Sequence, residues 1–269
     1  MSRLAADGTK LAARRWEPDG RARSTIVLVH GIAEHSGRYE HVGSALAAHG
    51  HQVVATDLRG FGASGGRRAF VERWDQYLDD LEGDVSGCRS DVPTVLMGHS
   101  MGGLVALSYV LSDRTRPDLL VLSAPAISAR ISPVKRMAAR VLGVLAPRVS
   151  IDNGLDGSML SRDPEVGHRY FADPLVHPRT TLALGRHALA AQRLVRRRLS
   201  DLDISTLVLH GAEDQIVPEP VSRPLESLPG VERIVFPGFR HESFNEDGGA
   251  VAVAAVADWL NGQIASTPR

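Results

Sequence analysis

The chain of 269 residues contains one cysteine, Cys88, so no disulfide can form within it. Lys and Arg together number 31, as do Asp and Glu, so the formal net charge is zero and gives no electrostatic reason to expect a nucleic acid partner. No apolar run approaches the roughly 20 residues that a transmembrane helix needs. The N-terminus also lacks the apolar stretch of a signal peptide. We therefore expect a soluble, cytoplasmic domain.

Short apolar runs recur along the chain and end at glycine, aspartate, serine or proline. They cover residues 25–31, 51–57, 93–100, 119–125, 205–211 and 232–238. Runs of this kind are typical of strands buried on both faces of a parallel sheet. Helical patterns lie between or after them, over residues 39–49, 71–90, 101–112 and 247–264. With a hairpin expected over residues 2–17, the chain is predicted to form an α/β fold with a mostly parallel central sheet flanked by helices.

The strand–helix alternation stops over residues 126–200, where the pattern is helical and no strand is evident. We interpret this segment as a helical cap, or lid, inserted into a core formed by residues 1–125 and 201–269. Its first helix is expected to begin near Pro133. One face of that helix carries Val134, Met137, Ala138, Val141, Leu142 and Leu145. The favoured interpretation packs this face on the core, and the alternative places it against acyl chains or a membrane surface.

Ser100 stands in the stretch Gly98-His99-Ser100-Met101-Gly102, between a strand pattern and a helical pattern. A sharp strand-to-helix turn crowds its neighbours, so small residues are needed two positions before and after the serine. A serine hydroxyl is a poor nucleophile without a base and a group that orients the base. The motif therefore predicts partners later in the chain.

The expected partners follow at the ends of later strand patterns, in the order serine, acid, histidine. Asp214 is the candidate acid after the run 205–211, with Glu213 as the alternative, and His241 is the candidate base after the run 232–238. The oxyanion of such a reaction is expected to be held by the backbone N–H groups of Met101 and of Ile32, in the loop after the first buried strand.

Eight stretches resemble the α/β-hydrolase family of monoacylglycerol lipases and lysophospholipases, over about residues 8–265. They are HGIAEHSGRYEHV, DLRGFGASGG, GHSMGG, LSAPA, SRDPEV, DPLVH, LVLHGAEDQIVP and PGFRHESFNE. The resemblance implies the same triad and the same oxyanion donors. It also implies that Glu34, Arg38, His99 and Tyr170 lie near the glycerol end of the pocket. The alternative is that Glu34 and Arg38 only brace their loop and that Tyr170 only packs in the cap.

Other motifs fail on their context. The glycines of GFGASG, residues 60–65, begin three residues after a strand pattern and do not open a helix, which excludes a dinucleotide fingerprint. The spacing of His30, Glu34 and His35 is one residue too long for a zinc motif, and Asn245 stands where HESFN would need a second histidine. We expect neither a metal nor a cofactor.

Together these features predict a serine carboxylester hydrolase that cleaves monoacylglycerol to fatty acid and glycerol through an acyl-enzyme. A lysophospholipase or a short-chain carboxylesterase is the alternative, and a non-catalytic ligand-binding protein of the same fold is the third hypothesis. The expected partner is a lipid or small ester, and peripheral membrane contact through the cap is a further hypothesis. Acyl length, head group and oligomeric state stay open at this stage.

Overall fold

An eight-stranded sheet lies at the centre of the computed structural model, which describes residues 1–128 and 133–266 apart from the side chains of Pro133, Lys135 and Ala138. The strands are β1 (Ser2–Leu4), β2 (Lys10–Trp16), β3 (Ser24–Val29), β4 (His51–Thr56), β5 (Thr94–His99), β6 (Leu119–Ser123), β9 (Thr206–Gly211) and β10 (Val231–Phe236). Their order is β1-β2-β4-β3-β5-β6-β9-β10. Strands β1 and β2 pair antiparallel, and β2 also pairs antiparallel with β4, while the other pairs are parallel. The predicted hairpin and mostly parallel sheet are confirmed.

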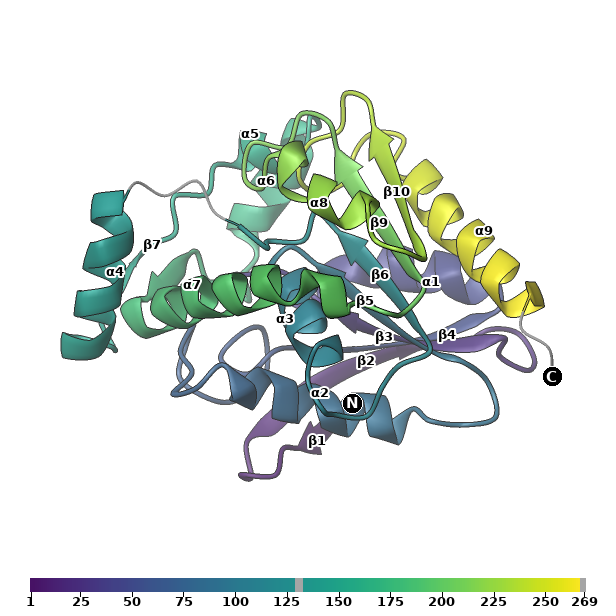
Figure 1. Cartoon of the computed structure of the whole chain (residues 1–269), viewed down its shortest axis with the longest axis horizontal. Helices are drawn as coiled ribbons and strands as arrows, with labels where there is room; N and C mark the ends of the chain where they lie inside the picture. Colours follow the sequence, from purple (N-terminus) through teal and green to yellow (C-terminus); the bar gives the residue numbers. More distant parts are fainter. Residues whose placement is uncertain (129–132, 267–269) are drawn as a thin grey trace.

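Helices cover both faces of this sheet and create two separate apolar cores (Figure 1). Helices α1 (Glu40–Ala48) and α9 (Ala250–Ser266) pack on one face. Helices α2 (Asp75–Gly87), α3 (Met101–Val110) and α7 (Leu182–Arg197) pack on the other. Helix α3 is buried almost throughout, because ten residues of mainly apolar or small side chains leave it no solvent face. It fixes the position of the residue that precedes it, Ser100.

Between β6 and β9 the chain forms most of its remaining helices. They are α4 (Pro133–Leu145), α5 (Gly157–Leu160), α6 (Pro164–Ala172) and α7. Short 3-10 turns and a helix complete the described chain, at Ser36–Tyr39 (η1), Leu199–Asp201 (η2), Glu219–Val221 (η3) and Arg223–Glu226 (α8). The expectation of a helical segment without strands was wrong in one respect. Strands β7 (Ser150–Asp152) and β8 (Arg179–Thr181) pair antiparallel, but three residues each are too few to give a readable alternation. The boundaries drawn for the cap, residues 126–200, stay a prediction.

Strand β10 departs from the expectation of burial on both faces. It lies at the edge of the sheet and most of its residues are half-exposed. Its run looks like a central strand because Ile234, Val235 and Phe236 are apolar, and edge position cannot be read from such a run. Within the described residues no helix is both long and apolar enough to cross a membrane.

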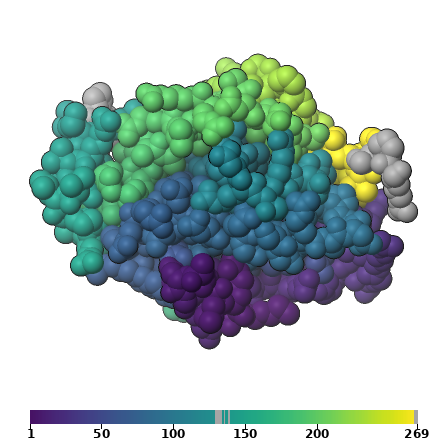
Figure 2. Space-filling model, turned by 60° about the horizontal axis from the view of Figure 1, so that its bottom comes forward, coloured from purple at the N-terminus to yellow at the C-terminus, as the bar shows by residue number. Residues whose placement is uncertain are grey.

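Helix α4 turns its apolar side away from the rest of the molecule, which contradicts the favoured prediction that this face packs on the core. Val134 is 78 % exposed and Leu145 is 74 % exposed, and Met137, Val141 and Leu142 are also exposed. The side chain of Ala138 lies outside the described residues. The packed side of α4 is the opposite one, where Gly143 fits against Leu182 and Arg186 of α7. Helix α4 stands at the edge of the molecule in Figures 1 and 2.

The later part of the same segment is bound tightly to the core. The N–H of His177 donates to the carbonyl of Ala33, at 2.8 Å, and the N–H of Glu242 donates to the carbonyl of Leu160, at 2.9 Å. Tyr170, Val166 and Leu160 pack in one apolar cluster with Ala33. These contacts tie the segment to two loops of the core, residues 30–36 and 239–246.

Candidate active site

Ser100 occupies a strained turn between β5 and α3. Its φ of 52° and ψ of −116° lie in a region that a residue with a side chain rarely adopts. The N–H of Ser100 donates to the carbonyl of Ser123, at 2.9 Å, and its carbonyl accepts from the N–H of Ala126, at 3.0 Å. These bonds to residues at and just after the end of β6 hold the strained conformation.

The glycines around Ser100 are required by close backbone contacts. A Cβ added to Gly102 would lie 2.2 Å from the carbonyl oxygen of Val29, and one added to Gly98 would lie 2.5 Å from the carbonyl oxygen of Gly102. Both distances are too short for carbon and oxygen, so a side chain at either position would move the turn. The structure gives a steric reason for the spacing that the sequence pattern predicted.

His241 connects the candidate acid to the candidate nucleophile. Its Nε2 lies 2.9 Å from Ser100 Oγ, and its Nδ1 lies 2.7 Å from Asp214 Oδ2. The loops after β9 and β10 deliver Asp214 and His241 to the end of the sheet where β5 delivers Ser100. The structure brings these three residues together in the order expected from the sequence, with hydrogen-bond distances throughout.

Asp214, and not its neighbour Glu213, contacts the imidazole. The Glu213 side chain is exposed, while Asp214 is buried and accepts from the N–H groups of Ile216 and Val217, each at 2.9 Å. Burial alone would raise the pKa of Asp214, but the His241 charge and the hydrogen bonds to this carboxylate outweigh it and lower the pKa. Asp214 is therefore ionised at neutral pH.

Ser100 and His241 are almost completely buried, and nearby charges shift the pKa of His241. Ser100 is 5 % exposed and His241 is 4 % exposed. Burial acts to lower the pKa of His241, but Asp214 chiefly, with Glu242 and Glu34, raises it above its ordinary value. An imidazole with this pKa accepts a proton from a hydroxyl more readily than an unpaired one.

Two backbone N–H groups are free to face a developing oxyanion. Ile32 and Met101 are the positions expected from the sequence, and neither N–H has an acceptor among the described residues. Their segments touch, because a Cβ added to Gly31 would lie 3.3 Å from Ser100 Cβ. Ala33, next to Ile32, has a φ of 69°, and the His177 hydrogen bond fixes its carbonyl. The loop conformation is thus held by the segment between β6 and β9.

Glu34 and Arg38 form a buried ionic network with a third residue, Glu242. Arg38 donates to Glu34 Oε2 at 2.7 Å and to both carboxylate oxygens of Glu242 at 2.6 and 2.7 Å. Glu34 Oε1 also accepts from the N–H of Gly31, at 2.6 Å, and from the Tyr39 hydroxyl, at 2.7 Å. Burial would raise the pKa of Glu34, but Arg38 and the nearby histidines lower it to about 2. Glu34 and Arg38 therefore brace their loop by an ion pair, as the alternative interpretation of the sequence expected.

His99 and Tyr170 lie on the border of this network. The His99 ring centroid is 4.8 Å from that of His241, and its Nδ1 is 3.2 Å from Ser123 Oγ. Burial, followed by the charge of His241, lowers the pKa of His99 to about 4, so it is neutral at pH 7. The Tyr170 ring lies under the Arg38 guanidinium at 4.7 Å, and its buried hydroxyl has no hydrogen-bond partner among the described residues.

Sequence reasoning missed two acids that hold the histidine loop. Glu242 follows His241 directly and pairs with Arg38, 204 positions earlier. Glu246 accepts from the N–H groups of Arg240 and Arg162, at 2.6 and 3.1 Å. The two acids within five residues of the candidate base were the available signal, but they do not identify a partner so far away in the chain.

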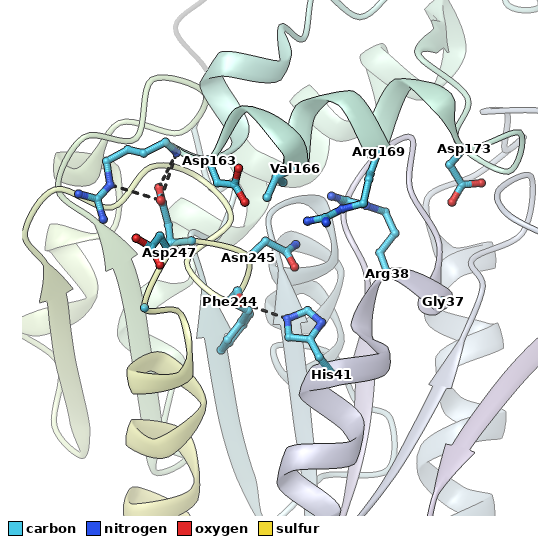
Figure 3. A pocket seen from close by; sticks show the side chains of 13 residues that line it. Gly37, Arg38, His41, Asp163, Val166, Arg169, Asp173, Phe244, Asn245 and Asp247 are labelled. Carbon is cyan, nitrogen blue, oxygen red and sulfur yellow. Dashed lines mark hydrogen bonds and ion pairs between the residues drawn. The ribbon is translucent and has the colours of Figure 1, made fainter.

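A pocket of about 840 Å³ opens beside the ionic network, as Figure 3 shows. Its lining includes Arg38, Arg169, Asp163, Asp173 and Asp247. Ser100 and His241 do not line it. A pocket with this charged lining lacks the apolar wall that an acyl chain needs, so it is not the acyl site.

Among the described residues, no group of three or more His, Cys, Asp and Glu side chains is arranged to hold a metal ion. The expectation of chemistry without a metal or cofactor stays a prediction. The described side chains that do converge, namely serine, imidazole and carboxylate, are those of nucleophilic catalysis by a hydroxyl.

Comparison with known proteins gives the same fold and a defined family. The family model described as serine aminopeptidase, S33, matches residues 20–248. The monoacylglycerol lipase of Mycolicibacterium smegmatis is 36 % identical over 262 residues, which cover 94 % of this chain and 93 % of that protein. The monoglyceride lipase of Homo sapiens is 34 % identical over 78 % of this chain and 72 % of its own length. The crystal structure of Paleococcus ferrophilus monoacylglycerol lipase superposes with a TM-score of 0.86 at 30 % identity, covering 93 % of this chain and 98 % of that one. The chain therefore belongs to the serine aminopeptidase S33 family and has the α/β-hydrolase fold predicted from its sequence.

Proposed function

We propose that this protein is a serine carboxylester hydrolase that cleaves monoacylglycerol to a fatty acid and glycerol. The observation that carries the proposal is the continuous set of contacts from Asp214 through His241 to Ser100. The monoacylglycerol and monoglyceride lipases among its relatives, at 36 % and 34 % identity, support the choice of substrate.

In the proposed reaction, Ser100 Oγ attacks the ester carbonyl carbon while His241 Nε2 takes the hydroxyl proton. The N–H groups of Ile32 and Met101 stabilise the negative charge on the former carbonyl oxygen. Collapse of this intermediate breaks the ester bond, and the departing glycerol oxygen takes the proton from His241. Water then attacks the acyl-enzyme with His241 as base, which releases the fatty acid and restores the Ser100 hydroxyl. Asp214 keeps Nδ1 protonated throughout and stabilises the imidazolium.

A peptidase and an ester hydrolase differ in whether the site must offer a free carboxylate to a charged group of the substrate. A peptidase that binds a free amino terminus needs an unpaired carboxylate near the nucleophile. Glu34 and Glu242, the acids beside His241, are both bonded to Arg38, and Asp163 caps the N-terminus of α6. This arrangement favours a neutral substrate such as monoacylglycerol over one that carries a free ammonium group. Lysophospholipase and short-chain esterase activities remain as alternatives that the substrate series below distinguishes.

The substrate series tests the proposal directly. We would measure fatty-acid release from monoacylglycerol, diacylglycerol, lysophosphatidylcholine and a short-chain aryl ester, with Ser100→Ala as control. Release greatest from monoacylglycerol and absent in the control supports the proposal. Activity on the aryl ester alone would retain the triad and refute the lipase assignment, and equal activity in the control would refute both.

The proposed glycerol-end residues can be tested at Tyr170. Its hydroxyl lacks a partner in the protein, so Tyr170→Phe removes no internal hydrogen bond and should not lower stability. If the hydroxyl binds the glycerol moiety, KM for monoacylglycerol rises several-fold while KM for a short aryl ester is unchanged. Equal KM values for monoacylglycerol in both proteins would assign Tyr170 to packing alone.

We also propose that the exposed side of the cap makes peripheral contact with an anionic lipid surface. The apolar face of α4 supplies the area to be buried. Helices α4 and α7 contain no Asp or Glu, and slight burial with the charges of Arg140, Arg197, Arg136 and Arg196 lowers the pKa of Arg193. Like charges gathered beside an apolar face favour a negatively charged bilayer. Location in the cytoplasm, with or without such contact, stays part of the proposal.

Vesicle co-sedimentation tests the contact. We expect binding to vesicles of phosphatidylcholine mixed with phosphatidylglycerol, and weaker binding to phosphatidylcholine alone. Leu145→Ser and Arg193→Gln should each weaken binding several-fold, whereas Val251→Ser, an exposed apolar residue on α9, should not. Equal binding by all variants would refute contact through the cap.

A further inference from the structure

A second buried histidine lies against the Asp214 carboxylate. His210 is in β9 and is fully buried. Its Nε2 lies 3.2 Å from Asp214 Oδ2 and 2.7 Å from the carbonyl oxygen of Val217. Both neighbours are acceptors, so Nε2 must carry the proton that it shares between them. His210 is thus a donor to the same carboxylate oxygen that accepts from His241.

The other nitrogen of this ring is held by a serine and an arginine. His210 Nδ1 lies 2.7 Å from Ser222 Oγ, and Ser222 Oγ accepts from Arg233 Nε at 3.0 Å. The Ser222 hydroxyl has a second acceptor, the carbonyl of Glu219, at the longer distance of 3.2 Å. With the proton on Nε2, Nδ1 can accept from the Ser222 hydroxyl, which gives the Nε2–H tautomer. A chain of hydrogen bonds therefore runs from Arg233 to Ser100.

Packing alone does not explain an imidazole at this position. Alternate residues of a strand share a face, so His210 lies on the same side of β9 as Val208, which packs in an apolar core. An aliphatic side chain would fill that place without the cost of burying a polar ring. The imidazole gains its compensation from the three hydrogen-bond partners, one of which is the candidate catalytic acid.

We infer that His210 is a positioning residue for Asp214. Oδ1 of Asp214 is held by two backbone N–H groups, while Oδ2 faces the two imidazoles. Among the described residues, the only other partner of Oδ2 is His241, the residue that the carboxylate must orient. The bond from His210 keeps the carboxylate in the plane in which Oδ2 accepts from His241 Nδ1. This inference rests on the catalytic role proposed for Asp214, but not on the identity of the substrate.

The experiment compares His210→Phe, which removes the donor, with His210→Gln, whose amide retains one. We expect kcat on a short aryl ester to fall about 10- to 100-fold in His210→Phe. In His210→Gln it should stay within about fivefold of the parent. His51→Phe is the matched control, because His51 is also fully buried and bonds a serine, Ser24, at 2.9 Å, in a strand that carries no site residue. Equal losses in His210→Phe and His51→Phe would overturn the inference.

Two further readouts separate positioning from general destabilisation. Loss of the His210 donor leaves Asp214 a stronger acceptor for His241, so the acid limb of kcat/KM should move to higher pH. In an Asp214→Asn background, His210→Phe should cause little further loss, because its effect passes through Asp214. An unshifted limb, or a loss of equal size in both backgrounds, would overturn the inference.

If His210→Phe does not fold, Ser222→Ala replaces it. Removal of the serine donor frees the imidazole to change tautomer, so a smaller loss of kcat is expected, again absent in the Asp214→Asn background. A loss that persists there would contradict the inference. The aryl ester keeps these outcomes independent of the monoacylglycerol assignment, while an inactive parent would refute the proposed function itself.

Discussion

The ends of the central strands and helix α4 are built in opposite ways. At the strand ends, Ser100, Asp214 and His241 are buried, and backbone or side-chain hydrogen bonds fix each of them. Helix α4 contacts α7 through a small residue, Gly143, and exposes its apolar side. Bond-making groups need positions exact to a fraction of an ångström, whereas apolar contact with a flexible chain is not directional. The strand ends thus hold their side chains in fixed positions, whereas α4 presents an apolar surface that needs no exact geometry.

The rigidly held region of the molecule does not end where the cap was expected to begin, at residue 126. The segment from Leu160 to His177 belongs to this region, since its backbone bonds both the loop of Ala33 and the loop of Glu242. The hydrogen bond between His35 Nε2 and Asp173 Oδ2, at 2.8 Å, adds a third connection. In mechanical terms the segment between β6 and β9 has a fixed inner part and an outer helix.

The largest difference is expected in stability. Leu184 of α7 is fully buried in the core, while Leu142 of α4 is 44 % exposed. Leu184→Ala should lower the free energy of unfolding by about 2–5 kcal/mol. Leu142→Ala should change it by less than about 0.5 kcal/mol, as expected for a surface site. Chemical denaturation measures both, and equal losses would show that α4 is as integral to the fold as α7.

A substitution at Gly102 tests whether activity depends on the exact position of the turn that holds Ser100. A Cβ there would lie 2.2 Å from the Val29 carbonyl, so Gly102→Ala must displace the turn that holds Ser100. We expect kcat to fall about 10²-fold or more. Gly262→Ala in α9 is the control, because no described atom outside its own helix backbone and chain neighbours lies within 4 Å of its added Cβ. A parent-like rate in Gly102→Ala would mean that the turn tolerates movement.

The pH dependence of activity should follow His241. The base must be neutral, and Asp214 raises its pKa above the ordinary value of 6.5, against the effect of burial. The acid limb of kcat/KM is therefore expected to have its midpoint above pH 6.5 and to fall about tenfold per pH unit below it. His99, with a pKa of about 4, stays neutral through this range. A midpoint below 6.5 would contradict the assigned electrostatics.

The smallest effect is expected at Gly185 in α7. Apart from its chain neighbours and the backbone of α7, no atom of the described residues lies within 4 Å of a Cβ added there, and the residue is helical with an ordinary φ. Gly185→Ala should therefore raise the free energy of unfolding by about 0.5–1 kcal/mol. A thermal or denaturant melt measures the gain. Destabilisation would show that α7 needs a glycine for a contact on the cap side.

Sequence reasoning reached the sheet, the two faces of helices and the three residues at the strand ends. It succeeded there because strands buried on both faces and a crowded turn leave local signals, such as the glycines at 98 and 102. It failed where the answer depends on distant parts of the chain. An amphipathic pattern shows which side of α4 is apolar, but not whether other residues cover that side. The role of Glu242 depends on its ion pair with Arg38, a residue 204 positions away.

The hydrogen bond from His177 to Ala33 has a consequence for exchanging parts between related enzymes. A graft that replaced everything between β6 and β9 would bring a foreign partner to the oxyanion loop and disturb the chemistry together with the substrate range. A graft limited to the outer helix, from α4 to Val149, would leave that bond in place. The lipid surface that the protein prefers and the rate of its reaction could then be changed independently, in evolution or by engineering.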